Sequence, residues 1–151
     1  MSSGNSRLLP AMLLSCGLSV IGVMIALVVA HRGWWAAETP EAGRLRTRLE
    51  AADPGWHDVE LRRRVENGSQ VIFAAGTHRL GNKRYSLMLL TREGADSVTV
   101  EVEDADESRL VARWAPPAEP AQTLPDGNLS THWDEAKGLM RQLREAFAEG
   151  R

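Results

Sequence analysis

The side chains that most often carry chemistry are few in this chain and lie far apart. The four histidines stand in separate segments, so no pair has metal-ligand spacing within one helix or hairpin. The single cysteine, Cys16, lies in an apolar segment, which excludes an internal disulfide and a thiolate metal site. No Gly-x-Ser-x-Gly elbow or Walker-type phosphate loop is present. The sequence predicts no catalytic residue, no cofactor and no metal.

One acidic segment has a pattern close to that of a calcium loop. Oxygen-bearing side chains alternate in Asp104-Ala105-Asp106-Glu107-Ser108. The sixth position of such a loop requires glycine and the twelfth glutamate, but this chain has Arg109 and Ala115 there. We therefore interpret the segment as an acidic hairpin turn.

Basic side chains gather in the middle of the chain, where they could form a patch for anionic headgroups. The candidates are Arg62, Arg64, Arg79, Lys83 and Arg84. Strand alternation sends Arg63 to the same face as Leu61 and Val65. Solvated edge charges that discourage aggregation are the alternative interpretation.

Composition excludes some classes of protein. The formal net charge is −2 and 25% of the residues are charged, so the chain has no field that favours nucleic acid and no composition typical of disorder. Arginine far outnumbers lysine, and with the many Ala, Gly and Pro residues this usage is typical of a GC-rich bacterium.

The clearest element is an apolar segment near the N-terminus. From Ala11 to Ala30 there are 20 residues without a charge, and with Leu8 and Leu9 the run is long enough for one transmembrane helix. Trp34 and Trp35 follow, where indole rings settle among headgroups. We expect residues 1–37 to form a tail, a transmembrane anchor in the lipid bilayer and an interfacial flank.

Processing and topology leave alternatives open. Cleavage after Ala30 would release a secreted domain, although the apolar run is longer than a signal peptide core. The Lys/Arg count favours a cytoplasmic domain, whereas a short tail before a long C-terminal domain is the usual signal-anchor arrangement. We adopt the second prediction: a single-pass protein of the cell (inner) membrane, with its domain outside the cytoplasm.

Small residues recur along the predicted membrane helix at spacings of three and four. They form one stripe, made of Ala11, Ser15, Ser19, Gly22, Ala26 and Ala30. Such a stripe lets a second helix approach closely, so it predicts a membrane-protein partner or a homodimer.

The remaining chain, 38–151, predicts one small soluble domain of the α+β class. Thr39-Pro40-Glu41 begins a helix that Asp53-Pro54-Gly55 ends, with Leu45, Leu49 and Ala52 on one side. This helix could instead lie on the membrane with its arginines.

Between residues 58 and 114 the apolar period is two, which predicts a five-stranded antiparallel meander. Asn67-Gly68 is a hairpin turn signal, and Val71, Phe73 and Ala75 follow at the strand period. Residues 115–127 are rich in proline and predict an irregular loop.

A C-terminal amphipathic helix completes the prediction. Thr131-His132-Trp133-Asp134 suggests a capping box with Asp in place of Glu. The apolar stripe that follows consists of Trp133, Ala136, Leu139, Met140, Leu143, Ala146 and Phe147.

These features predict a membrane-anchored, non-enzymatic accessory or interaction module of a bacterial cell-envelope complex. The alternative is an enzyme or ligand-binding domain whose site only the fold assembles. A pocket lined by two or more of His57, His78 and His132 with nearby acids would favour that alternative.

Overall fold

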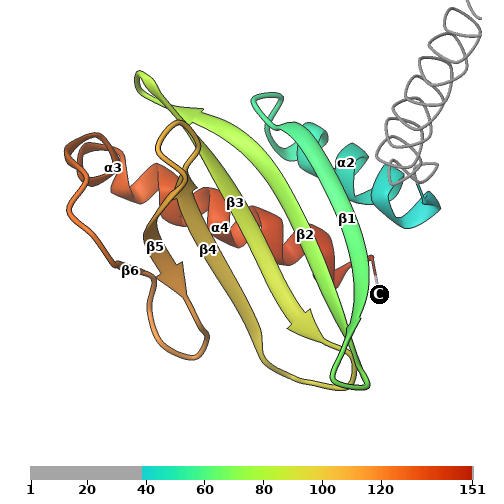
Figure 1. Ribbon diagram of the computed structural model, residues 1–151. Coiled ribbons are helices and arrows are strands. Elements are labelled where there is room, and N and C mark those ends of the chain that lie inside the picture. Colours follow the sequence, from blue (N-terminus) through green and yellow to red (C-terminus); the bar gives the residue numbers. More distant parts are fainter. Residues whose placement is uncertain (1–38, 151) are drawn as a thin grey trace, which may run out of the picture. The chain divides into compact units, whose positions relative to one another are not determined.

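The computed structural model describes residues 39–150 (Figure 1). The predicted membrane helix 8–30, its small-residue stripe and the flanking Trp34 and Trp35 lie outside the described residues. Within residues 39–150, no helix is long and apolar enough to cross a membrane.

The chain folds as an α+β domain with one antiparallel sheet. Helix α2 (Pro40–Ala52) precedes the strands, and α3 (Gly127–Thr131) and α4 (Trp133–Ala148) follow them. The strands are β1 (His57–Glu66), β2 (Ser69–Leu80), β3 (Lys83–Arg92), β4 (Val98–Asp104), β5 (Arg109–Trp114) and β6 (Ala121–Gln122). They pair in chain order, so the predicted meander is confirmed.

The sheet has six strands, and the prediction of five was wrong. The added strand is β6, in which Ala121 and Gln122 pair with Arg113 and Ala112 of β5. Pro120 and Pro125 cannot donate to a ladder, but the residues between them can. A strand of two residues is too short to show an alternation of apolar and polar residues, so the sequence predicted only a loop here.

Helix α2 begins and ends where its sequence signals predict. The Thr39 hydroxyl accepts the backbone N–H of Ala42 at 3.2 Å, and Pro40 is the first helical residue. Ala42, Leu45 and Leu49 are buried, whereas the predicted Ala52 is exposed.

The first hairpin also follows its sequence signal. Asn67 and Gly68 both have positive φ, 50° and 77°, as a type I′ turn requires. Glu66 pairs with Ser69 across this turn.

Helix α4 buries the predicted stripe but does not begin with the predicted capping box. All of the stripe is buried except Trp133, which is only partly buried. Residues 127–131 form α3, and the Thr131 hydroxyl donates to the Gly127 carbonyl inside it. The N-cap of α4 is therefore His132, which makes no side-chain cap bond.

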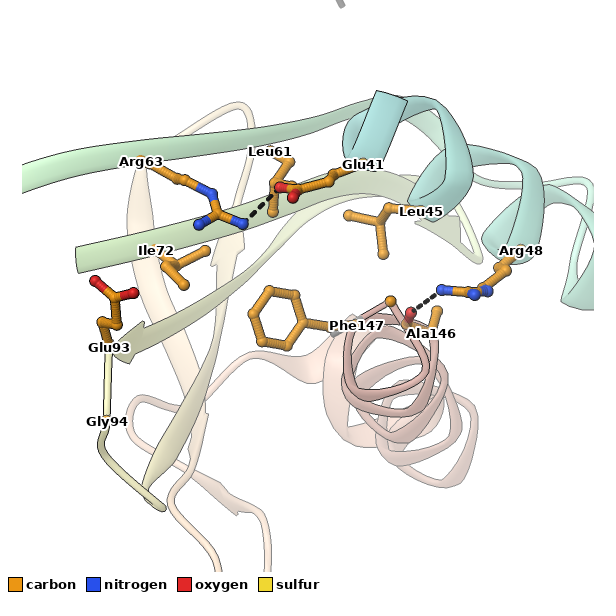
Figure 2. A pocket seen from close by; sticks show the side chains of 11 residues that line it. Glu41, Leu45, Arg48, Leu61, Arg63, Ile72, Glu93, Gly94, Ala146 and Phe147 are labelled. Carbon is orange, nitrogen blue, oxygen red and sulfur yellow. Dashed lines mark hydrogen bonds and ion pairs between the residues drawn. The ribbon is translucent and has the colours of Figure 1, made fainter. Parts of the chain in front are cut away.

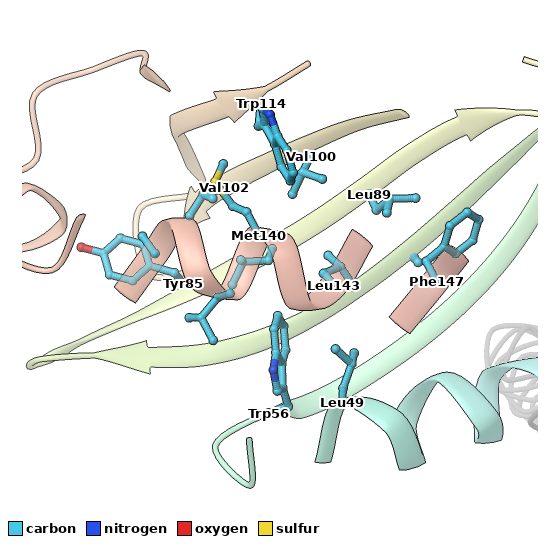
Figure 3. Close-up of a cluster of buried hydrophobic side chains, with 14 of the residues drawn as sticks. Leu49, Trp56, Tyr85, Leu89, Val100, Val102, Trp114, Met140, Leu143 and Phe147 are labelled. Carbon is cyan, nitrogen blue, oxygen red and sulfur yellow. The ribbon is translucent and has the colours of Figure 1, made fainter. Parts of the chain in front are cut away.

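Helices α2 and α4 cover one face of the sheet. Alternate residues on that face are fully buried in the centre of the sheet, among them Leu87, Leu89, Val100 and Val102 (Figure 3). Trp56, from the connection between α2 and β1, is 1% exposed and lies in the same core.

Candidate functional site

The face of the sheet opposite the helices has an apolar centre; we call it the open face. Val71, Phe73 and Ala75 of β2 alternate with the core-facing residues, and Met88 and Leu90 of β3 lie beside them. Phe73 pairs with Leu90, and Ala75 with Met88. Among the described residues, no helix crosses this face (Figure 1). A sheet face turned to solvent normally carries polar residues, so this centre is unusual.

Charged residues border the apolar centre on both sides. On β1, Arg62 pairs with Phe73, Arg64 with Val71 and Glu60 with Ala75. On β4, Glu101 pairs with Met88 and Glu103 with Ser86.

The predicted basic residues do not form one patch. Arg62 and Arg64 lie on the open face of β1, where they pair with Glu60 at 2.7 Å and with Glu66. Arg79, Lys83 and Arg84 lie at the other end of the sheet, around the β2–β3 turn. There the Arg79 guanidinium donates to the Asn82 carbonyl at 3.3 Å, and Arg84 lies 3.8 Å from Asp106.

Lys83 belongs to a buried polar cluster that the sequence did not reveal. Its ammonium group lies 2.8 Å from the Asp104 carboxylate and 3.4 Å from the Asp126 carboxylate. The Tyr85 hydroxyl donates to Asp126 at 3.1 Å, and the Asn128 amide donates to that hydroxyl at 2.9 Å. Both aspartates are buried, at 0% and 4% exposure.

Both aspartates of this cluster also bond to backbone N–H groups. Asp104 accepts the N–H groups of Asp106 and Glu107 in the predicted acidic hairpin turn, which the structure confirms. Asp126 accepts the Leu129 N–H at 2.8 Å and so caps α3. The cluster therefore holds the turn and the loop before α3 against the end of the sheet.

The charges of the cluster shift one another's pKa. The Lys83 hydrogen bond holds the pKa of Asp104 below its ordinary value, against the effect of burial. Burial raises the pKa of Asp126, but bonds from Leu129, Tyr85 and Lys83 outweigh it and leave that pKa lowered. The Asp104 bond raises the pKa of Lys83. The lowered pKa of both carboxyls favours their ionised form.

The three histidines of the described residues do not line one common cleft. His78 lies 3.1 Å from Asp53 and 2.8 Å from the Arg79 carbonyl, with Trp56 edge-on at 5.6 Å. His132 lies 3.2 Å from Glu135, and His57 is exposed. A cleft of about 240 Å³ is lined by His78, Asp53 and Glu135 but by no second histidine. Residues 39–150 contain no group of three or more His, Cys, Asp or Glu residues placed to hold a metal ion.

A second cleft, of about 340 Å³, opens between α2, β1 and the end of α4 (Figure 2). Its apolar wall includes Leu45, Ile72 and Phe147. Arg63 lies at its rim beside Leu61, as alternation predicted, and pairs with Glu41 at 2.6 Å.

Comparison with known proteins adds no assignment: no family model, no curated protein and no solved structure matches this chain. The fold and the site together define the domain as an α+β domain whose open sheet face is partly apolar.

Proposed function

We propose that this protein is a membrane-anchored, non-enzymatic accessory module that assists assembly of a bacterial cell-envelope complex. We further propose that it binds through the open face. The observation that carries the proposal is the apolar centre of that face, which no helix covers within residues 39–150.

Burial of this centre would supply binding energy. Phe73, Met88 and Leu90 are each partly exposed. Covering apolar surface releases about 25 cal/mol per Å², and contiguous apolar patches commonly mark interaction sites. By contrast, the buried carboxylates of the Lys83 cluster are engaged in structural bonds, which favours binding over catalysis.

The predicted anchor supplies the second part of the proposal. A helix over residues 8–30 would hold the domain at the inner membrane, with the domain outside the cytoplasm. Its small-residue stripe would contact a membrane-protein partner or a second copy. A partner engaged by both parts would bind more tightly than either contact alone allows.

The test is affinity purification of the full-length protein in mild detergent, with and without Leu90→Glu. The buried charge should lower recovery of the bound partner at least about tenfold, because it would lie unpaired in the contact. Leu124→Glu is the matched control, since Leu124 is exposed at 41% and lies in the loop before α3. Equal recovery of the partner by the wild type and Leu90→Glu would rule out the open face.

A second candidate function is favoured by the cleft between α2, β1 and α4. Its volume of about 340 Å³ is within the range of small-molecule sites, about 300–1,000 Å³. An apolar molecule that copurifies with the full-length protein, and is lost on Ile72→Arg, would support ligand binding instead.

A further inference from the structure

The strand register arranges the open face in rows that cross the sheet. Four central rows follow one another from the β1–β2 turn outward: Arg64–Val71–Arg92, Arg62–Phe73–Leu90–Thr99, Glu60–Ala75–Met88–Glu101 and His57–Thr77–Ser86–Glu103. An outer row, Glu66–Ser69, lies at the β1–β2 turn, and another, Arg79–Arg84, lies at the β2–β3 turn. The first two central rows carry arginines at their edges, namely Arg64, Arg92 and Arg62, and the last two carry glutamates, namely Glu60, Glu101 and Glu103; we call these the basic half and the acidic half. The separation of charge is not complete, because Arg113 lies 3.4 Å from Glu101 and Arg62 bonds to Glu60 at 2.7 Å across the boundary between the halves. The apolar centre lies where the two halves meet.

This arrangement is complementary to itself. A two-fold axis across the strands, between the second and third rows, would place the basic half of one copy on the acidic half of another. Phe73 would face Ala75 of the other copy, large against small, and Leu90 would face Met88. A two-fold interface requires such matching, because each contact occurs twice.

We infer that the occupant of the open face is a second copy of this chain, packed sheet to sheet about this axis. The inference rests on the proposed function, since it identifies the partner of the surface proposed there. Aligned sheets pack about 10 Å apart with interdigitated side chains, as the alternation of large and small residues here permits.

Two charged side chains support this occupant over an unrelated protein. Arg92 is exposed and Glu103 is partly buried, and within the described chain neither takes part in an ion pair. The two-fold axis brings Arg92 of one copy opposite Ser86 of the other, one strand away from that copy's Glu103. Strands are about 4.8 Å apart, so the pair is within reach and forms twice.

The size of the face predicts where the dimer forms. Four strands about 4.8 Å apart and four rows about 6.7 Å apart cover on the order of 500 Å². A standard stable interface buries about 800 Å² on each partner, so the isolated domain should associate weakly. A shared membrane raises the effective concentration, so the full-length protein should dimerise there.

The test uses full-length Cys16→Ser protein in vesicles of phosphatidylethanolamine and phosphatidylglycerol. Thr99→Cys places a thiol on the second row, beside the axis, for a short bismaleimide cross-linker. We expect a cross-linked dimer whose yield falls about tenfold with Arg92→Glu or with Glu103→Arg, because like charges then oppose. The double variant, Arg92→Glu with Glu103→Arg, should restore the yield of cross-linked dimer. The control thiol, Asp134→Cys, replaces a 95% exposed side chain on α4 and should not cross-link.

Three outcomes would overturn the inference. Equal cross-linking from residues 99 and 134 would indicate random collision, and failure of the double variant to restore the dimer would remove the proposed charge pair. A product of another mass would identify a different occupant and leave the proposed function standing. If, in addition, Leu90→Glu leaves partner recovery unchanged, the proposed function fails as well.

Discussion

Trp56→Ala is expected to lower the free energy of unfolding by about 3–5 kcal/mol, among the largest effects of any single substitution in the domain. The indole is 1% exposed and connects three parts of the fold. Its Nε1 donates to Gln142 of α4 at 3.0 Å, and its ring lies over Gly76 of β2. Truncation would leave a cavity there and deprive the partly buried Gln142 amide of its donor. Urea unfolding of the domain 38–151, followed by circular dichroism, measures the loss.

Matched substitutions separate this effect from a general cost of mutation. Trp133→Ala removes a partly buried indole and should cost less. A Cβ on Gly76 would lie 2.8 Å from the Trp56 ring, so Gly76→Ala should destabilise by about 1–3 kcal/mol. Gly138 has open space around it in α4, so Gly138→Ala should stabilise by about 0.5–1 kcal/mol. Equal effects of Gly76→Ala and Gly138→Ala on the free energy of unfolding would contradict this packing.

Asp126→Ala is expected to lower the free energy of unfolding by about 2–4 kcal/mol. It removes the cap of α3, the acceptor of the Tyr85 hydroxyl and one carboxylate near Lys83. Asp126→Asn keeps a side-chain oxygen for the Leu129 and Tyr85 donors, so it should cost less. The same urea measurement compares them, and equal costs would show that the charge, not the hydrogen bonds, matters.

The lowered pKa of Asp126 and Asp104 also sets the sign of a pH dependence. Both carboxyls bind protons more weakly in the folded chain than in the unfolded chain. Their contribution to stability is therefore complete above about pH 5 and is lost as pH falls through the lowered native values. The urea midpoint should fall in acid, and Asp126→Asn should show a smaller fall. An identical pH profile for both proteins would assign the acid sensitivity to other groups.

Local signals predicted the elements that depend on neighbouring residues. The Thr39-Pro40 start of α2 and the Asn67-Gly68 turn were both confirmed because each is decided by a few adjacent φ angles and hydrogen bonds. The capping box failed because residues 127–131 could form a helix of their own once Asp126 capped them. That competition depends on the buried contacts of Asp126, which local spacing does not show.

Which face of the sheet stays open could be determined only from the structure. Strand β2 is apolar on both faces, so the period of Val71, Phe73 and Ala75 could not say which face the helices cover. The set that faces the helices proved to be the other one, with Ala74 at 0% exposure and Ile72 at 7%, while Ala75 of the open face is also buried, at 6%. The Lys83 cluster was hidden for another reason, since its contacts join residues 21 and 43 positions apart. Such separations leave no pattern in one sequence.

The most direct test of whether the open face is covered in the assembled protein is the labelling rate of a thiol placed on it. Full-length Cys16→Ser, Thr99→Cys protein is treated with a membrane-permeant maleimide in native membranes and again in a dissociating detergent. The proposal predicts labelling at least about fivefold slower in membranes, with Asp134→Cys labelled equally in both, because a contact excludes reagent from its centre. Equal rates for Thr99→Cys in the two conditions would show an uncovered face and contradict the proposed interaction surface.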